Sequence, residues 1–187
     1  MSAFGSSAVT RSNKVFTVRE STRSLAADVV PSASYRHYFS PTSYNDGIRL
    51  LPDRWPGHNI NNYPQQHYDQ GVSKNEGTSR RYKCVVRILK NLENRMVADG
   101  TSPVVASYLI ESLVYNTPNP SFSNGSTWGQ HTRNVLGHIW EATEPLDCET
   151  IWTEANGIKY LFHVWQKWNR DEARAFVHAA WQYVAKS

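Results

Sequence analysis

The chain has 187 residues, of which 40% are hydrophobic and 19% are charged, and this composition is typical of a globular protein of one domain or slightly more. The formal charge of +4 suits anionic ligands such as nucleotides but is too small to indicate a large nucleic-acid footprint. No apolar run approaches the roughly 20 residues of a membrane span, and the first residues lack the apolar core of a signal peptide. With two cysteines in all, a reduced cytoplasmic protein is expected rather than a disulfide scaffold.

The first part of the chain is expected to form strands and loops. Four short runs predict strands, the first two joined as a hairpin: 14–19, 25–30, 34–39 and 47–51. From Pro52 to Lys74 the chain is rich in Pro, Gly, Asn and Gln. This stretch is therefore expected to be a connector without regular structure.

The chain from Asn75 onward is predicted to be helical. Apolar residues spaced at three and four predict a helix that Thr78 or Ser79 caps and that Asp99-Gly100 ends. Further helices are predicted from about Pro103 to Pro118, from Trp128 to Glu141, and after Asn169, which with Glu172 resembles a capping box. The expected fold class is α+β, a partial β-sheet followed by a C-terminal helical bundle.

One acid, Asp28, lies in the middle of the predicted strand 25–30, whose other residues are mostly apolar. A buried acid is costly unless it is paired, so a functional role has to be considered. A carboxylate on a strand is a suitable ligand for Mg²⁺, but two-metal phosphoryl transfer needs several acids around ions about 3.5–4 Å apart. The alternative is a structural acid bonded to a neighbouring arginine such as Arg19 or Arg23.

A stripe of cations runs along the helix predicted after Ser79. Its members are spaced at three, four and three: Arg80, Lys83, Arg87 and Lys90. The stripe flanks the apolar face, so the side-chain stems can pack while the charged ends reach phosphates. The alternative is an ordinary solvated face.

A third group of candidates opens the next helix. The hydroxyl of Ser107 near a helix start can bond a phosphate, and the ring of Tyr108 offers a flat face for a base. Tyr108 can equally be a core residue. Glu111 can bond Ser107, pair with a cation of the stripe, or face water. The seven histidines show no ligand spacing and are expected to be structural or exposed.

Taken together, these segments resemble bacterial nucleotidyltransferases related to cyclic GMP–AMP synthase and oligoadenylate synthase, which make cyclic oligonucleotide signals in anti-phage defence. The segments that carry the resemblance are, in chain order, 4–11, 27–31 (Ala-Asp-Val-Val-Pro), Tyr35-Arg36, Gln66-His67-Tyr68, Gly71-Val72, Lys74-Asn75, 86–90, 107–111 (Ser-Tyr-Leu-Ile-Glu) and 173–184. They cover nearly the whole chain, which is similar to the C-terminal two-thirds of these polymerase-β-type enzymes.

The resemblance implies a role for each candidate. Asp28 matches the third catalytic carboxylate, which binds Mg²⁺ or Mn²⁺ and activates the acceptor hydroxyl. Lys90 and Ser107 match residues that grip the triphosphate of the NTP substrate, and Tyr108 matches the residue that stacks on its base. Lys83 and Arg87, from the same stripe as Lys90, complete the set of nucleotide-binding candidates: Lys83, Arg87, Lys90, Ser107 and Tyr108.

The sequence departs from the family pattern near its beginning. The family places a Gly-Ser turn and then an Asp-x-Asp or Asp-x-Glu pair before the third acid, but Gly5-Ser6 is followed by 14–20, which contains no such pair. Met1 is therefore expected to lie inside the catalytic domain, after both acids, and the chain alone is expected not to transfer nucleotides. On this interpretation residues 1–74 are the remainder of the catalytic domain with its connector, and 75–187 are the helical domain.

Other functions stay open from the sequence. The chain can be a non-catalytic module that binds a nucleotide or a partner, or one half of a split enzyme whose missing strands and acids come from a separate chain. A split enzyme predicts an exposed β edge, because unpaired strand edges associate. A transfer-RNA nucleotidyltransferase is the enzymatic runner-up, although the modest charge argues against a large RNA footprint.

Overall fold

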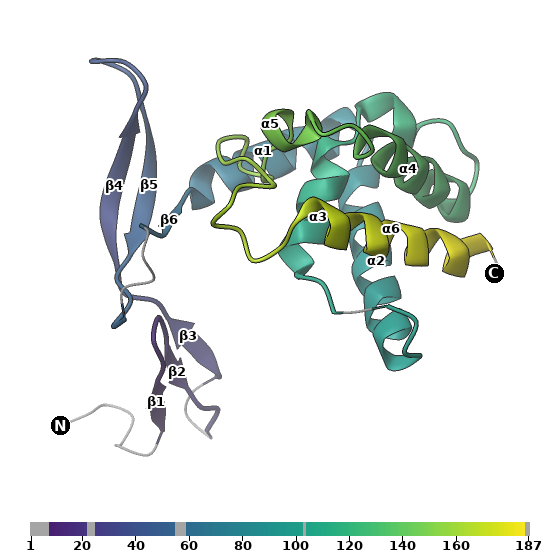
Figure 1. Cartoon of the computed structure of the whole chain (residues 1–187). Coiled ribbons are helices and arrows are strands. Elements are labelled where there is room, and N and C mark those ends of the chain that lie inside the picture. Colours follow the sequence, from purple (N-terminus) through teal and green to yellow (C-terminus); the bar gives the residue numbers. More distant parts are fainter. Residues whose placement is uncertain (1–7, 22–24, 55–58, 103, 186–187) are drawn as a thin grey trace. The chain divides into compact units, whose positions relative to one another are not determined.

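The computed structural model describes residues 8–21, 25–54, 59–102 and 104–185 (Figure 1). These form two compact units, Met1–Gln65 and Gln66–Ser187. The first contains the strands and the second is helical, so the predicted α+β fold class is confirmed. The division expected after Lys74 falls inside a helix, whereas the two units meet between Gln65 and Gln66.

The first unit begins with a three-stranded antiparallel sheet. Its strands, in the order β1-β2-β3, are β1 (Val9–Arg11), β2 (Phe16–Val18) and β3 (Ala27–Val29). The predicted hairpin is confirmed, since Thr17 of β2 is the register partner of Asp28 on β3. The expectation of a mostly buried apolar strand around Asp28 is wrong: all three residues of β3 are exposed, as is Leu25 before it.

A second antiparallel sheet completes the first unit. Its order is β4-β5-β6, with β4 (Ser32–Tyr38), β5 (Tyr44–Leu50) and β6 (Asn61–Asn62). β4 and β5 form the long two-stranded ribbon of Figure 1. Gly47 is required on β5, because a Cβ there would lie 2.7 Å from the carbonyl oxygen of Asn62 and 2.9 Å from the ring of Tyr63.

Helix α1 (Pro64–Gly77) occupies the stretch that was expected to lack regular structure, so that prediction is wrong at its C-terminal end. The reason is that α1 is a polar helix: only Gly71 is buried, and there is no apolar stripe for a periodicity argument to find. Polar contacts with helix α3 and with the residue that follows it hold α1 instead. Lys74 Nζ donates to the carbonyl oxygen of Thr117 at 2.5 Å, and Tyr115 donates its hydroxyl to Gln70 Oε1 at 3.1 Å.

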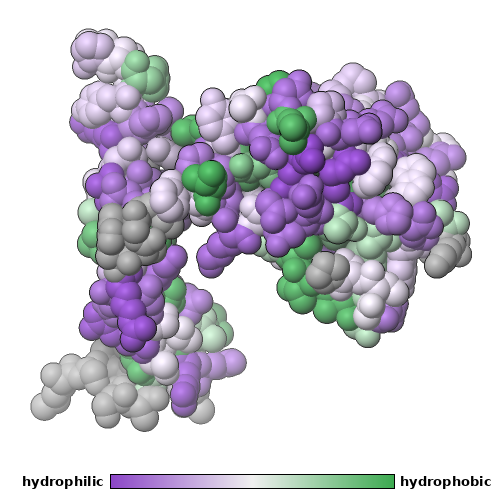
Figure 2. Space-filling view, viewed as in Figure 1, coloured by the Kyte–Doolittle hydropathy of each residue, from purple (hydrophilic) through white to green (hydrophobic). Residues whose placement is uncertain are grey.

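The rest of the second unit is a helical bundle around one core. Its elements are α2 (Arg81–Ala98), α3 (Ser107–Asn116), the 3₁₀ helix η1 (Asn119–Phe122), α4 (Trp128–Ala142), α5 (Cys148–Ile151) and α6 (Arg170–Ala185). Helix α2 contacts α3, α4 and α6, and its predicted apolar face is buried. In Figure 2, polar side chains cover much of the visible face of this unit and apolar ones form smaller patches.

The helix ends follow the predicted chemistry in part. The cap position of α2 is Arg80, whose side chain makes no capping hydrogen bond, so neither Thr78 nor Ser79 is the cap residue that was predicted. Thr78 still satisfies one amide of the first turn, because its Oγ1 accepts a hydrogen bond from the Tyr82 amide at 3.0 Å. Asn169 and Glu172 form the reciprocal capping box of α6, each side chain accepting from the other's amide at 2.9 and 3.0 Å. Pro103, the expected start of the next helix, lies outside the described residues.

Two further expectations concern the whole chain. Cys84 and Cys148 are both free thiols in the structure. Among the described residues, none of the helices has the length and apolar character needed to span a bilayer.

Candidate functional site

Three helices of the second unit bring one residue each into an ionic cluster, the Glu111 cluster, made of His67 from α1, Lys90 from α2 and Glu111 from α3. Lys90 Nζ donates to Glu111 Oε2 at 2.8 Å, and His67 Nε2 lies 2.9 Å from Glu111 Oε1. Each carboxylate oxygen thus has its own partner. Of the three fates considered for Glu111, pairing with a cation of the stripe is the one observed.

The ionisation of Glu111 follows from these contacts. Burial by itself would raise the pKa of the Glu111 carboxyl, since the side chain is only 23% exposed. The hydrogen bonds and charges of Lys90 and His67 outweigh burial and hold the pKa below its ordinary value. Glu111 is therefore a carboxylate at neutral pH, and its negative charge is compensated within the cluster.

Tyr108 lies beside this cluster, one helical turn before Glu111 on α3. Its ring centroid is 5.2 Å from that of His67, with the rings nearly perpendicular, and 6.4 Å from that of Trp168. The Tyr108 hydroxyl donates to Glu154 Oε2 at 3.4 Å. Burial, followed by the nearby charge of Glu154, raises the pKa of the Tyr108 phenol, so the phenol stays neutral.

A buried acid anchors the far side of Tyr108. Glu154 is 5% exposed, and three side chains of the segment that follows it bind its carboxylate: Asn156 at 2.6 Å, Gln166 at 2.6 Å and Lys159 at 3.0 Å. The segment is closed by a bridge between Thr153 and Tyr160. A buried carboxylate with this many partners is compensated, and its position fixes the direction in which the Tyr108 hydroxyl points.

The remaining candidates of the second unit are exposed. Ser107 is the first residue of α3, where backbone amides lack intrahelical partners. Lys83 and Arg87 lie on α2 in the two turns before Lys90. Arg80 does not continue the stripe as a helical residue, because it precedes α2 in a left-handed conformation with φ of 65°.

Asp28 belongs to the first unit and is exposed on β3. Its Oδ1 accepts a hydrogen bond from the Thr17 hydroxyl at 2.8 Å across the β2–β3 pair. Because Asp28 is exposed, its carboxylate does not carry the free-energy cost of a buried acid. Of the two arginines considered as structural partners, Arg23 lies outside the described residues.

The residues present do not form a complete site for catalytic metal ions. In the described parts of the chain no group of three or more His, Cys, Asp or Glu residues is placed to hold a metal. Asp28 offers one carboxylate, whereas a two-metal centre needs several. The described residues alone are therefore too few to bind the two Mg²⁺ or Mn²⁺ ions of such a centre.

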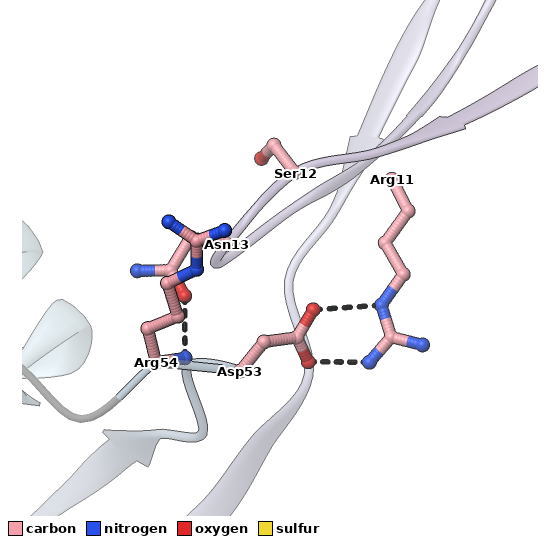
Figure 3. A pocket seen from close by; sticks show the side chains of 5 residues that line it. All are labelled: Arg11, Ser12, Asn13, Asp53 and Arg54. Carbon is pink, nitrogen blue, oxygen red and sulfur yellow. Dashed lines mark hydrogen bonds and ion pairs between the residues drawn. The ribbon is translucent and has the colours of Figure 1, made fainter.

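A pocket of about 510 Å³ lies in the first unit, and none of its lining residues is a predicted candidate (Figure 3). It is lined by Arg11, Ser12, Asn13, Asp53 and Arg54. The Arg11 guanidinium binds both oxygens of Asp53, and this contact holds the pKa of the Asp53 carboxyl below its usual value. Because the two charges compensate each other, the pocket carries no net charge from this pair.

Two residues of the site were not predicted. His67 was grouped with scattered histidines, although it stands in the Gln66-His67-Tyr68 segment of the family resemblance, and that was the available signal. Glu154 gave no signal, because its partners lie on a segment with neither helical nor strand periodicity.

Comparison with known proteins adds an independent line of evidence. The family profile described as the cGAS/DncV-like nucleotidyltransferase C-terminal helical domain matches residues 69–185. A cyclic dipyrimidine nucleotide synthase, CdnE, of Legionella pneumophila is 35% identical over 98% of this chain and 61% of its own length. This chain therefore spans about three-fifths of that relative.

Solved structures of similar proteins agree. The Elizabethkingia meningoseptica CdnE cyclic dinucleotide synthase, solved with GTP and Apcpp, superposes with a TM-score of 0.81 at 33% identity over 95% of this chain and 65% of that one. The Rhodothermus marinus CdnE c-UMP-AMP synthase, solved with Apcpp and Upnpp, gives a TM-score of 0.83 at 29% identity, covering 98% and 61% of the two chains.

Proposed function

We propose a function from one premise: the chain belongs to the cGAS/DncV-like nucleotidyltransferases, whose C-terminal helical domain it carries. The resemblance found in the sequence is thereby confirmed. On this premise, the chain is the part of a cyclic-oligonucleotide synthase that holds the NTP substrate, and the intact enzyme joins NTPs into signals for anti-phage defence by two-metal nucleotidyl transfer. The observation that supports the proposal is that Lys90 and Tyr108 both contact the His67–Glu111 pair: Lys90 binds Glu111, and the Tyr108 ring lies against that of His67.

The proposed roles match the chemistry of each group. The Lys90 ammonium and the Ser107 hydroxyl bind oxygens of the triphosphate, with the exposed charges of Lys83 and Arg87 adding to the attraction. The ring of Tyr108 stacks on the base. That two relatives were solved with nucleotides or their analogues supports a nucleotide as the ligand.

Asp28 is proposed as one ligand of Mg²⁺ or Mn²⁺ in the intact enzyme. The further acids come from a segment or chain beyond the residues described, so this chain alone does not transfer nucleotides. The exposed strand β3, with Val29 54% exposed and Leu25 just before it 81% exposed, is a suitable edge for the strands of that segment to cover.

An activity assay and a binding assay together test this function. The purified chain, given the four NTPs and Mg²⁺, is expected to yield no cyclic oligonucleotide by mass spectrometry. A product that Asp28→Asn abolishes would overturn the claim of inactivity while keeping the synthase assignment.

In a calorimetric titration with a non-hydrolysable NTP, Lys90→Met and Tyr108→Leu are each expected to weaken binding about tenfold, and Gln182→Ala on α6 is the control.

A non-catalytic nucleotide-binding module is the second candidate, because all five nucleotide-binding candidates lie in one unit that has its own core. Such a module binds NTPs equally well with and without a divalent metal. Sequencing the DNA upstream of the Met1 codon separates the two: an in-frame Gly-Ser followed by Asp-x-Asp favours the synthase, and a stop codon favours the module.

A further inference from the structure

Glu111 joins three helices at the point where the triphosphate is proposed to bind. Its two oxygens receive Lys90 from α2 and His67 from α1, at 2.8 and 2.9 Å. The pair partners lie 21 and 44 residues away in the chain, so neither contact follows from the helix itself. All three side chains are partly exposed, at 23% for Glu111, 31% for Lys90 and 36% for His67, so the cluster lies at the surface of the unit.

This arrangement restricts a side chain that is otherwise mobile. A lysine has a flexible four-carbon stem, and its side chain loses rotamer entropy when it binds a ligand. Glu111 holds the Lys90 ammonium with one of its three hydrogens, and two hydrogens remain for other acceptors. His67 occupies the second oxygen of Glu111, so the carboxylate cannot turn away from Lys90 without breaking another contact.

We propose that Glu111, whose second oxygen is bonded to His67, is a positioning residue. It holds the Lys90 ammonium where it can bind a phosphate oxygen of the NTP. The proposal rests on the proposed function, in which Lys90 binds the triphosphate. Because Glu111 already restricts the Lys90 side chain in the folded chain, less side-chain entropy is lost when a ligand binds, and Lys90 contributes more to the affinity. The ligand class is a linear triphosphate, free or attached to a nucleoside.

Two other roles for Glu111 make different predictions. If the carboxylate only ties three helices together, Lys90 contributes the same affinity whether or not Glu111 is charged. If the carboxylate instead competes with phosphate for the ammonium, Lys90 contributes more once Glu111 is neutral. Positioning predicts the opposite, a Lys90 that contributes less.

A double-mutant cycle separates these roles, with inorganic tripolyphosphate as the probe and a metal chelator present. The dissociation constant is measured by calorimetry for the wild-type chain, Lys90→Met, Glu111→Gln and the double variant. Lys90→Met is expected to weaken binding about tenfold in the wild type and less than about twofold in the Glu111→Gln background. An equal or larger loss in that background would overturn the proposal.

The cycle also tells this proposal apart from the function on which it rests. If Lys90→Met leaves the wild-type affinity unchanged, the assignment of Lys90 to the triphosphate fails, and the positioning role fails with it. If Lys90 contributes affinity that does not depend on Glu111, the function stands and only the positioning role is overturned.

His67 supplies a second test that does not alter Glu111. His67→Gln keeps a side-chain donor for Glu111 and is expected to retain the Lys90 contribution, whereas His67→Leu, which has no donor, is expected to lose most of it. Equal behaviour of the two His67 variants would contradict the proposal. Glu149→Gln, which removes a carboxylate facing Arg170 at 3.9 Å, is the matched control and is expected to leave tripolyphosphate binding unchanged.

Discussion

The two units of this chain use their apolar residues in opposite ways. In the helical unit a continuous core runs through α2, α3, α4 and α6, and large side chains such as Phe176 and Phe122 are almost fully buried. In the described residues of the β unit, Val18 and Tyr63 are the buried hydrophobic side chains, while Leu25 and Phe39 are 81% and 67% exposed. The helical unit therefore has an apolar core of its own, whereas the described part of the β unit leaves most of its large apolar side chains exposed.

The largest expected effect tests this difference directly. Phe176→Ala removes a side chain that is 1% exposed and should lower the free energy of unfolding of the helical unit by about 3–5 kcal/mol. Leu25→Ala, at an exposed residue of the β unit, should change the free energy of unfolding of the chain by less than about 0.5 kcal/mol. Urea unfolding followed by far-ultraviolet circular dichroism measures both. Similar losses for the two variants would break the comparison.

A smaller loss is expected from the buried acid of the helical unit. Glu154→Ala removes the 2.6 Å acceptor of both Asn156 and Gln166 and leaves them only longer bonds, to the Tyr108 hydroxyl at 3.5 Å and the Tyr160 carbonyl at 3.2 Å. Lys159, at 37% exposure, can turn to water. We expect a loss of about 2 kcal/mol in the free energy of unfolding. The same variant frees the Tyr108 hydroxyl and should weaken NTP binding. Glu141→Ala, on the exposed face of α4, is the control, and a Glu154→Ala chain as stable as this control would contradict the interpretation.

The pH dependence of stability sharpens the comparison at the Glu111 cluster. The pKa of the Glu111 carboxyl is lowered from its ordinary value of 4.5 in the folded chain, so its stabilising effect is full above pH 4.5. That effect is lost as the pH falls through the folded pKa. Urea midpoints measured from pH 7 downward should therefore fall less steeply in Glu111→Gln than in the wild type. Identical profiles would show that Glu111 gains nothing from Lys90 and His67.

The smallest effect concerns the start of α6. Asn169→Ala removes the oxygen that accepts a hydrogen bond from the Glu172 amide at 2.9 Å. The free energy of unfolding, measured by thermal denaturation, should fall by about 1 kcal/mol. Gln182→Ala, an exposed substitution within the same helix, should change the melting temperature little. Should both variants melt like the wild type, the capping box would not contribute to the stability of this unit.

Much of the helical unit could be predicted from local patterns. The apolar spacing of α2, the capping residues of α6 and the bounds of α4 all follow from chemistry within one or two helical turns. The candidate site was predicted only in part. Lys90 and Tyr108 were identified, but His67 and Glu154 were not, because their roles come from partners far along the chain.

The sequence by itself determined the fold class, the family, the β2–β3 hairpin and the amphipathic helices, since each rests on a period, a cap or a motif that neighbouring residues encode. Tertiary structure alone decided three features. Helix α1 forms without an apolar stripe because α3 and its C-terminal end supply its polar partners. Asp28 is exposed because no described residue covers either face of β3. The Glu111 cluster exists because packing brings together residues up to 44 positions apart, a contact that no local pattern encodes.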